Sequence, residues 1–396
     1  MLMIALGTRT LILAVPILAI LASPGSAKPY TPGDDAVVLE RLPEKNQPSL
    51  TELKRLRATL LAHPRDLEVA TRVATRSIEA ARATGDPRFL GQAQAALNPW
   101  WTAADAPAPA LLLRATIKQS QHDFSGALAD LDRLLTDRPS HGQALLTRAT
   151  ILTVQGRYKD AQRDCAKLLP LASALVTATC LAGARSLNGD AGSAYSGLTQ
   201  ALARPGEAAV VRAWALTLAA EIAARRGEPA AAESHFRAAL ALDPRDSYLR
   251  GAYADFLLLA GRARDVLPLV ANDTKNDSML LRLALAEQVL PEHAPAFATH
   301  RTELSDRFAA AKMRGDTLHL REEARFRFEI ENDPKAALAL AQQNWKTQRE
   351  PADLHVLAKA ARATGDAVAL KTVADWIAAT KLEDPATVAL LAGTAR

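Results

Sequence analysis

A tight turn between two helices recurs along this chain at a nearly constant spacing. Gly156-Arg157-Tyr158 forms one copy, and Ala161, which follows it, has its counterpart at Ala127, one period earlier. Later copies of the turn lie at Gly189, Gly227 and Gly261, each close to one further period along the chain. A period of about 34 residues, built from two helices, indicates a solenoid in which each unit buries its apolar face on the next.

Small residues mark the points where the two helices of each unit are expected to cross. They are alanines in the first helix, at 115, 149, 182, 220 and 254, and in the second, at 127, 161, 194 and 232. A larger residue follows one turn later in the second helix: Leu131, Cys165, Leu198 and Phe236. Small side chains allow close approach of two helix axes, and the larger side chain fills the next hole. The pattern therefore predicts antiparallel helix pairs.

These turns and crossings resemble the tetratricopeptide repeat (TPR). The match is carried by Gly156-Arg157-Tyr158 with Ala161, and by Gly227-Glu228-Pro229 with three later residues, Ala232, Phe236 and Pro244. The tryptophan, leucine and tyrosine of the family's first helix are mostly replaced here by leucine and alanine. The resemblance implies an all-α fold, a right-handed superhelix of antiparallel helix pairs, of the exported bacterial type.

Residues 1–27 predict a secretory signal peptide. Arg9 supplies a weak positive charge, Leu11–Ala22 is an apolar run broken only by Pro16, and Gly25-Ser26-Ala27 offers small residues for cleavage. The run is short for a membrane span. We therefore expect a periplasmic or secreted protein with no stable span after cleavage, and an uncleaved anchor is the alternative.

The rest of the chain divides into three parts. Residues 28–66 predict a proline-rich extended leader and an N-terminal capping helix, and residues 67–270 predict the TPR array. Residues 271–396 predict diverged helical repeats that continue the solenoid, with a separate helical bundle as the alternative. Within them, Arg321–Glu331 alternates charges at three- and four-residue spacing, which is typical of a solvated helix face.

The chain contains no recognisable catalytic motif. GxSxG, a phosphate-binding glycine loop and HExxH are all absent from the sequence. A formal charge of +5 without a basic stripe does not indicate nucleic-acid binding. We therefore predict a non-enzymatic protein with no catalytic residues, no metal site and no cofactor.

Two cysteines, Cys165 and Cys180, lie on helices expected to pack against each other. An exported protein meets an oxidising compartment, which favours a disulfide between them. Each residue also suits a small buried apolar position, so two core thiols are the alternative.

The TPR resemblance implies that a partner binds along the concave surface, which the first helix of each unit lines. The residues expected there are Thr116, Gln119, Thr150, Thr153, Trp214, Thr217, Glu221, Arg225, Tyr248 and Asp255. This set predicts a neutral, threonine-rich groove in which Trp214 and Tyr248 are the anchors. Trp214 could instead pack between repeats.

Together these features predict an exported scaffold or adaptor that captures a segment of another envelope protein. One alternative is a binder of cell-wall glycan or of a small ligand. Another is an enzyme whose site is scattered over the C-terminal third.

We predict that the mature protein begins at Lys28. Cleavage after Gly25-Ser26-Ala27 removes the whole apolar run, because signal peptidase requires small residues just before the cut. The intact mass of exported protein should match residues 28–396. A mass that includes residues 1–27 would contradict this cleavage site.

Overall fold

Acidic side chains start many helices of this protein. The carboxylates of Asp66, Asp123 and Asp246 each accept a hydrogen bond from the backbone N–H three residues later, over 3.0, 2.9 and 3.1 Å. Such caps satisfy backbone donors that have no partner within the helix and contribute about 1 kcal/mol each. The computed structural model describes residue 34 and residues 48–393. The predicted signal peptide lies outside them.

Antiparallel helix pairs follow one another through the first two thirds of the described chain. The first eight helices are α1 (Pro48–Ala62), α2 (Leu67–Thr84), α3 (Arg88–Ala96), α4 (Asn98–Trp101), α5 (Ala108–Ser120), α6 (Phe124–Asp137), α7 (Gly142–Val154) and α8 (Tyr158–Ala166). The next six are α9 (Ala174–Arg185), α10 (Ala191–Leu202), α11 (Ala209–Arg225), α12 (Pro229–Leu242), α13 (Ser247–Leu259) and α14 (Ala263–Val270). The described residues contain no strand, which confirms the predicted all-α solenoid.

The C-terminal third continues the same stacking. Its elements are α15 (Asp277–Gln288), the 3-10 helix η1 (Pro291–His293), α16 (Ala294–Met313), α17 (Leu320–Arg325), the π-helix η2 (Phe326–Ile330), α18 (Pro334–Trp345), α19 (Pro351–Thr364), α20 (Ala367–Thr380) and α21 (Pro385–Ala392). The helices α13, α15, α17 and α19 contact one another in turn, as the first helices of the earlier pairs do. Residues 48–393 belong to one compact unit.

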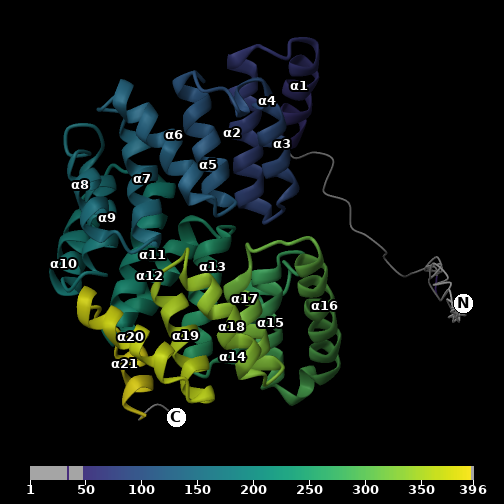
Figure 1. Cartoon of the computed structure of the whole chain (residues 1–396), viewed down its shortest axis with the longest axis vertical. Coiled ribbons are helices and arrows are strands. Elements are labelled where there is room, and N and C mark those ends of the chain that lie inside the picture. Colours follow the sequence, from purple (N-terminus) through teal and green to yellow (C-terminus); the bar gives the residue numbers. More distant parts are fainter. Residues whose placement is uncertain (1–33, 35–47, 394–396) are drawn as a thin grey trace, which may run out of the picture. The chain divides into compact units, whose positions relative to one another are not determined.

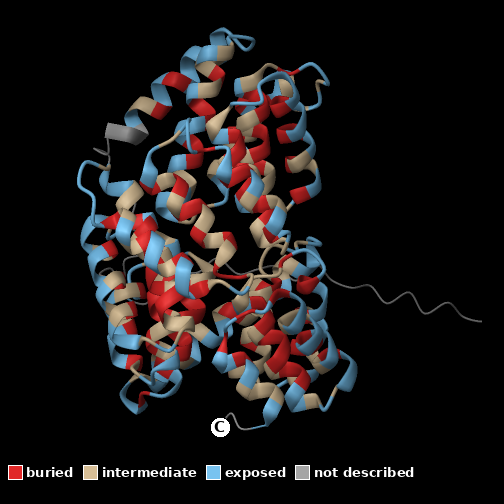
Figure 2. Ribbon diagram, turned by 90° about the vertical axis from the view of Figure 1, so that its left-hand side faces the viewer, coloured by how far each residue is buried: buried red, intermediate tan, exposed pale blue. Residues whose placement is uncertain are grey.

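The alanines predicted at the helix crossings are buried. Ala115, Ala127 and Ala161 have no exposed surface, and Leu131 and Phe236 fill the adjacent holes. Figure 2 shows buried residues along the sides where neighbouring helices meet and exposed residues on the outward sides. The core is therefore a series of apolar clusters between successive helices rather than one central cluster.

The array closes on itself, because its last helices return to the turns of its first half. The backbone N–H of Arg349 donates to the carbonyl of Val154 over 2.8 Å, and Glu383 accepts from the N–H of Ala191 over 3.1 Å. Figure 1 shows the last helices, in yellow, beside α10. We call these contacts the closure; they join segments that lie far apart in the sequence.

Gly156 has a second role at this closure. Its φ of +75° lies in the left-handed region that a side chain disfavours. A Cβ at this position would also lie 2.3 Å from the indole ring of Trp376 on α20. Trp376 in turn packs edge-on against Tyr158 and Trp345. The repeat's turn glycine therefore also makes room for the returning helix.

Cys165 of α8 and Cys180 of α9 form a disulfide in the structure, with their Cα atoms 5.5 Å apart. The bond joins the second helix of one pair to the first helix of the next.

The segment Arg321–Glu331 does not form the solvated face that the charge pattern suggested. Glu322 and Phe326 are buried, and the segment ends in the π-helix η2. The charges are enclosed because they pair with residues of other helices, such as Arg325 with Asp255 over 2.8 Å. Local spacing alone could not reveal these distant partners.

We predict that Gly156→Ala destabilises the protein more than Gly227→Ala. Both glycines have φ of +75°, but the space around a Cβ at Gly227 is empty within 4 Å. The clash with Trp376 should add about 1–3 kcal/mol to the loss in unfolding free energy. Urea denaturation of both variants measures the difference. Equal losses would mean that the closure does not form.

Candidate functional site

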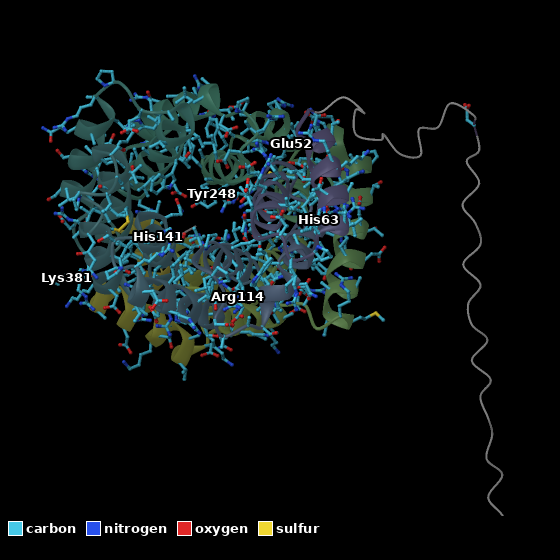
Figure 3. All side chains as sticks on the ribbon, turned by 90° about the horizontal axis from the view of Figure 1, so that it is seen from above. Glu52, His63, Arg114, His141, Tyr248 and Lys381 are labelled. Atoms are coloured by element: carbon cyan, nitrogen blue, oxygen red, sulfur yellow. A yellow bond between two sulfur atoms is a disulfide. The ribbon has the colours of Figure 1, made fainter. Side chains whose placement is uncertain are left out.

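Two equivalent rows of side chains lie on α11 and α13. Trp214 and Glu221 are two helical turns apart and therefore lie on one face of α11. Tyr248 and Asp255 occupy the equivalent positions one repeat later and form the same row on α13. We call the face that carries these rows, together with the charged groups that meet them, the inner surface. Figure 3 shows Tyr248 on the inner side of the surrounding helices.

Tyr248 joins the two rows. Its hydroxyl donates to the Glu221 carboxylate over 2.7 Å. The Glu221 carboxylate, and after it the surrounding protein, raises the pKa of Tyr248, so the hydroxyl stays protonated as the donor. Burial raises the pKa of Glu221, and Tyr248 and Arg225 offset this only in part. Tyr248 nevertheless keeps 60% of its surface exposed, which leaves its ring free to contact a ligand.

Asp255 is not free to bind a partner, because two arginines already hold it. Arg282 of α15 donates to one carboxylate oxygen over 2.5 Å and Arg325 of α17 to the other over 2.8 Å. Burial alone would raise the pKa of Asp255, but the two guanidinium groups outweigh it and lower the pKa to about 2. This residue therefore fastens α13 to the C-terminal third.

A second charged cluster lies where α17 meets the start of α19. Arg321 approaches Glu350 at 3.1 Å and Asp353 at 3.3 Å. Asp353 also accepts from the Asn344 amide over 2.8 Å and from the backbone N–H of Glu350 over 2.9 Å. Burial raises the pKa of Asp353 against these favourable contacts. The cluster fixes the loop that carries the closure residue Arg349.

The threonines expected to donate hydrogen bonds to a partner donate them to their own helices. The hydroxyls of Thr116, Thr150, Thr153 and Thr217 each donate to the carbonyl four residues earlier, over 2.8–3.0 Å. Thr217 is also buried. Toward a partner these hydroxyls can therefore act as acceptors.

The remaining expected residues differ in their accessibility. Trp214 is 38% exposed and Gln119 is half-buried, so both face outward from the core. Arg225 donates to the hydroxyl of Ser186 over 3.1 Å, while its Nε is buried without a partner among the described residues. The structure thus brings Glu221 and Tyr248 together and leaves Trp214 accessible in the same row as Glu221.

The inner surface also carries charged side chains that were not among the residues expected there. Arg282, Arg321 and Arg325 all pair with carboxylates that belong to other helices. Arg321 and Arg325 were missed because their segment was expected on a solvated face, and Arg282 was missed because its local sequence does not reveal its partner Asp255. The signal for Arg321 and Arg325 was the unusual density of arginine and glutamate in a segment that is also rich in phenylalanine.

The described residues offer little for chemistry on a metal. No group of three or more histidine, cysteine, aspartate or glutamate residues among them is placed to hold a metal ion. Among the same residues, no helix combines the length and apolarity needed to cross a bilayer.

Neither family models nor curated proteins match this chain. Solved structures that it resembles include a tetratricopeptide repeat protein from Parabacteroides merdae ATCC 43184, with 13% identity and a TM-score of 0.29 over 79% of this chain and 92% of that one. The P58(IPK) TPR domain has 16% sequence identity and a TM-score of 0.24, and the match covers 81% of this chain and 97% of that domain. A monomeric IFIT1 mutant with Gppp-AAAA has 12% sequence identity and a TM-score of 0.42, and the match covers 87% of this chain and 85% of that one.

The resemblance is to tetratricopeptide-repeat proteins. Identities and TM-scores this low carry no argument about function, so the assignment of the fold rests on the helix pairs themselves.

We predict that Asp255→Asn lowers the unfolding free energy by about 3 kcal/mol near pH 7, because it leaves two enclosed arginines without their carboxylate. Since the folded pKa of about 2 lies below the ordinary value, Asp255 stabilises the fold above pH 4 and this contribution is lost as the pH falls toward 2. The difference between wild type and variant should therefore shrink in acid.

Urea denaturation across this pH range measures the effect. Asp375→Asn on α20 is the matched control, because Asp375 pairs only with the exposed Lys371. It should change stability little at any pH. A loss for Asp255→Asn that does not vary with pH would contradict the proposed ion pairs.

Proposed function

We propose that this protein is an exported, non-enzymatic scaffold that captures a segment of another envelope protein on its inner surface. The observation that carries the proposal is the accessible pair Trp214 and Tyr248 in equivalent rows of neighbouring helices. Aromatic side chains of this kind supply most of the binding energy in many interfaces. The predicted signal peptide supports export, and a disulfide between Cys165 and Cys180 is compatible with an oxidising compartment.

The neighbours of this pair favour a peptide ligand. Glu221 lies beside Tyr248, and Arg225 follows one turn later on the same helix. An acceptor and a donor one turn apart suit the alternating N–H and C=O groups of an extended backbone. The two rings would contact side chains of the same segment. Binding therefore combines apolar contact with backbone hydrogen bonds.

The closure limits how a segment enters. Because Asp255 holds α13 to α15 and α17, and Arg321 holds α17 to the start of α19, the inner surface is rigid before binding. A preformed surface loses less conformational entropy when it binds. We infer capture of a flexible partner segment rather than of a large folded face.

We predict that a photo-cross-linking amino acid at position 248 captures one partner in cells. The same amino acid at Val368, which is 78% exposed on α20, is the matched control and should not capture that partner. A Trp214→Ala/Tyr248→Ala double variant, with wild-type helical content, should lose partner binding by at least tenfold, since each anchor contributes roughly 2 kcal/mol. Equal capture from both positions, or undiminished binding by the folded double variant, would move the site elsewhere.

A further inference from the structure

His122 occupies a position in the α5–α6 turn that is held by glycine in the equivalent turns of later repeats. Its N–H and that of Asp123 bond to the carbonyls of Gln119 and Lys118, as Gly156 and its successor do one repeat later. The same bonds recur at Gly227 and Gly261. All three glycines have φ of 70–75°, and His122 has φ of 57°. A side chain in this conformation costs of order 1 kcal/mol, so its retention points to a use for the imidazole.

The imidazole is held in a defined orientation. It stacks on Phe124 with ring centroids 5.5 Å apart, and the Gln348 amide donates to Nδ1 over 3.2 Å. Burial lowers the pKa of His122, so the ring is neutral near pH 7. With Nδ1 accepting, the proton resides on Nε2, which is left as a donor.

A cavity of about 750 Å³ opens beside this ring. It lies between the α5–α6 turn, the segment that leads into α17, and one side of α18. Its lining is Gln121, His122, Thr317, Leu320, Ala339, Gln342, Gln343, Lys346 and Thr347. The size falls within the range of roughly 300–1,000 Å³ typical of small-molecule sites.

The lining groups define a ligand chemistry. Gln342, Gln343 and Lys346 make no side-chain hydrogen bond or ion pair with the described residues. The carboxamides of Gln342 and Gln343 offer donors and acceptors together, which suits vicinal hydroxyl groups. Gln121 already donates to Gln94 over 3.3 Å and Thr347 to the carbonyl of Asn344 over 3.1 Å, so these two mainly add acceptors. Lys346 is the lining's single full charge, and no carboxylate lines the cavity to repel an anion. Leu320 and Ala339, together with the aliphatic parts of the glutamine and lysine side chains, give the cavity an apolar surface on which the C–H face of a sugar ring can lie.

From this juxtaposition we propose that the cavity beside His122 binds an acidic oligosaccharide. Sugar hydroxyls bond to the glutamine amides and to Nε2 of His122, and a sugar carboxylate pairs with Lys346. The C–H face of a ring lies on Leu320 and Ala339. This site is separate from the inner surface and does not depend on the protein-capturing function.

The test is isothermal titration calorimetry of residues 28–396 with trigalacturonic acid, with neutral maltotriose, and with the acidic peptide Ala-Glu-Ala. We expect saturable binding of trigalacturonic acid, and at least tenfold weaker binding of maltotriose. Lys346→Met should weaken trigalacturonic acid binding at least tenfold. Lys335→Met, an exposed lysine at the other end of α18, is the matched control and should leave it unchanged.

His122→Gly separates binding from folding. Glycine removes the stack on Phe124 and the hydrogen bond from Gln348 but also relieves the strain at φ of 57°, so these effects offset each other and the melting temperature should change little while the affinity drops at least tenfold. Absence of binding by all three ligands, preference for the peptide, or wild-type affinity in Lys346→Met and His122→Gly would each overturn the proposal. Trp214→Ala/Tyr248→Ala should keep full oligosaccharide affinity, so failure of the protein-capture proposal leaves this result unaffected.

Discussion

Close approach of helices at alanine is the interaction on which this structure depends. No single helix pair can bury its own apolar face, so each crossing must be shared with the next pair. The completely buried Ala115, Ala127 and Ala161 let neighbouring helices come near enough for Leu131 and Phe236 to fill the holes between them. The rigid rows of the inner surface follow from this regularity, because Trp214 and Tyr248 occupy equivalent positions in successive repeats.

A second constraint shapes what the rows can do. A solenoid of this length could leave its inner surface open along its whole course, yet here Asp255 ties α15 and α17 to it, and the Arg321 cluster ties α19 to α17. Charges that would otherwise meet a ligand are used to hold α15, α17 and α19 in place. The surface left for recognition is therefore local: Trp214, the Tyr248–Glu221 pair and Arg225.

The sequence allowed prediction of what is periodic. The turn at Gly156 and the buried alanines follow from local spacing. The placement of Arg325 did not, because its partner Asp255 lies 70 residues away and the i,i+4 pattern fits a solvated face equally well. A residue list likewise does not show that each threonine hydroxyl is already bonded to its own helix.

The closure also sets an order of events. The contacts of Tyr158 with Arg349 and of Ala191 with Glu383 span 191 and 192 residues, and that between His122 and Gln348 spans 226. Contacts so distant in sequence form slowly, because the intervening chain must first be ordered. Because the N-terminal end is synthesised first, α2 to α12 can stack through contacts between neighbouring helices alone. The closure forms only after α18 to α20 have been synthesised. The helices that are made last therefore stabilise the helices that were made first.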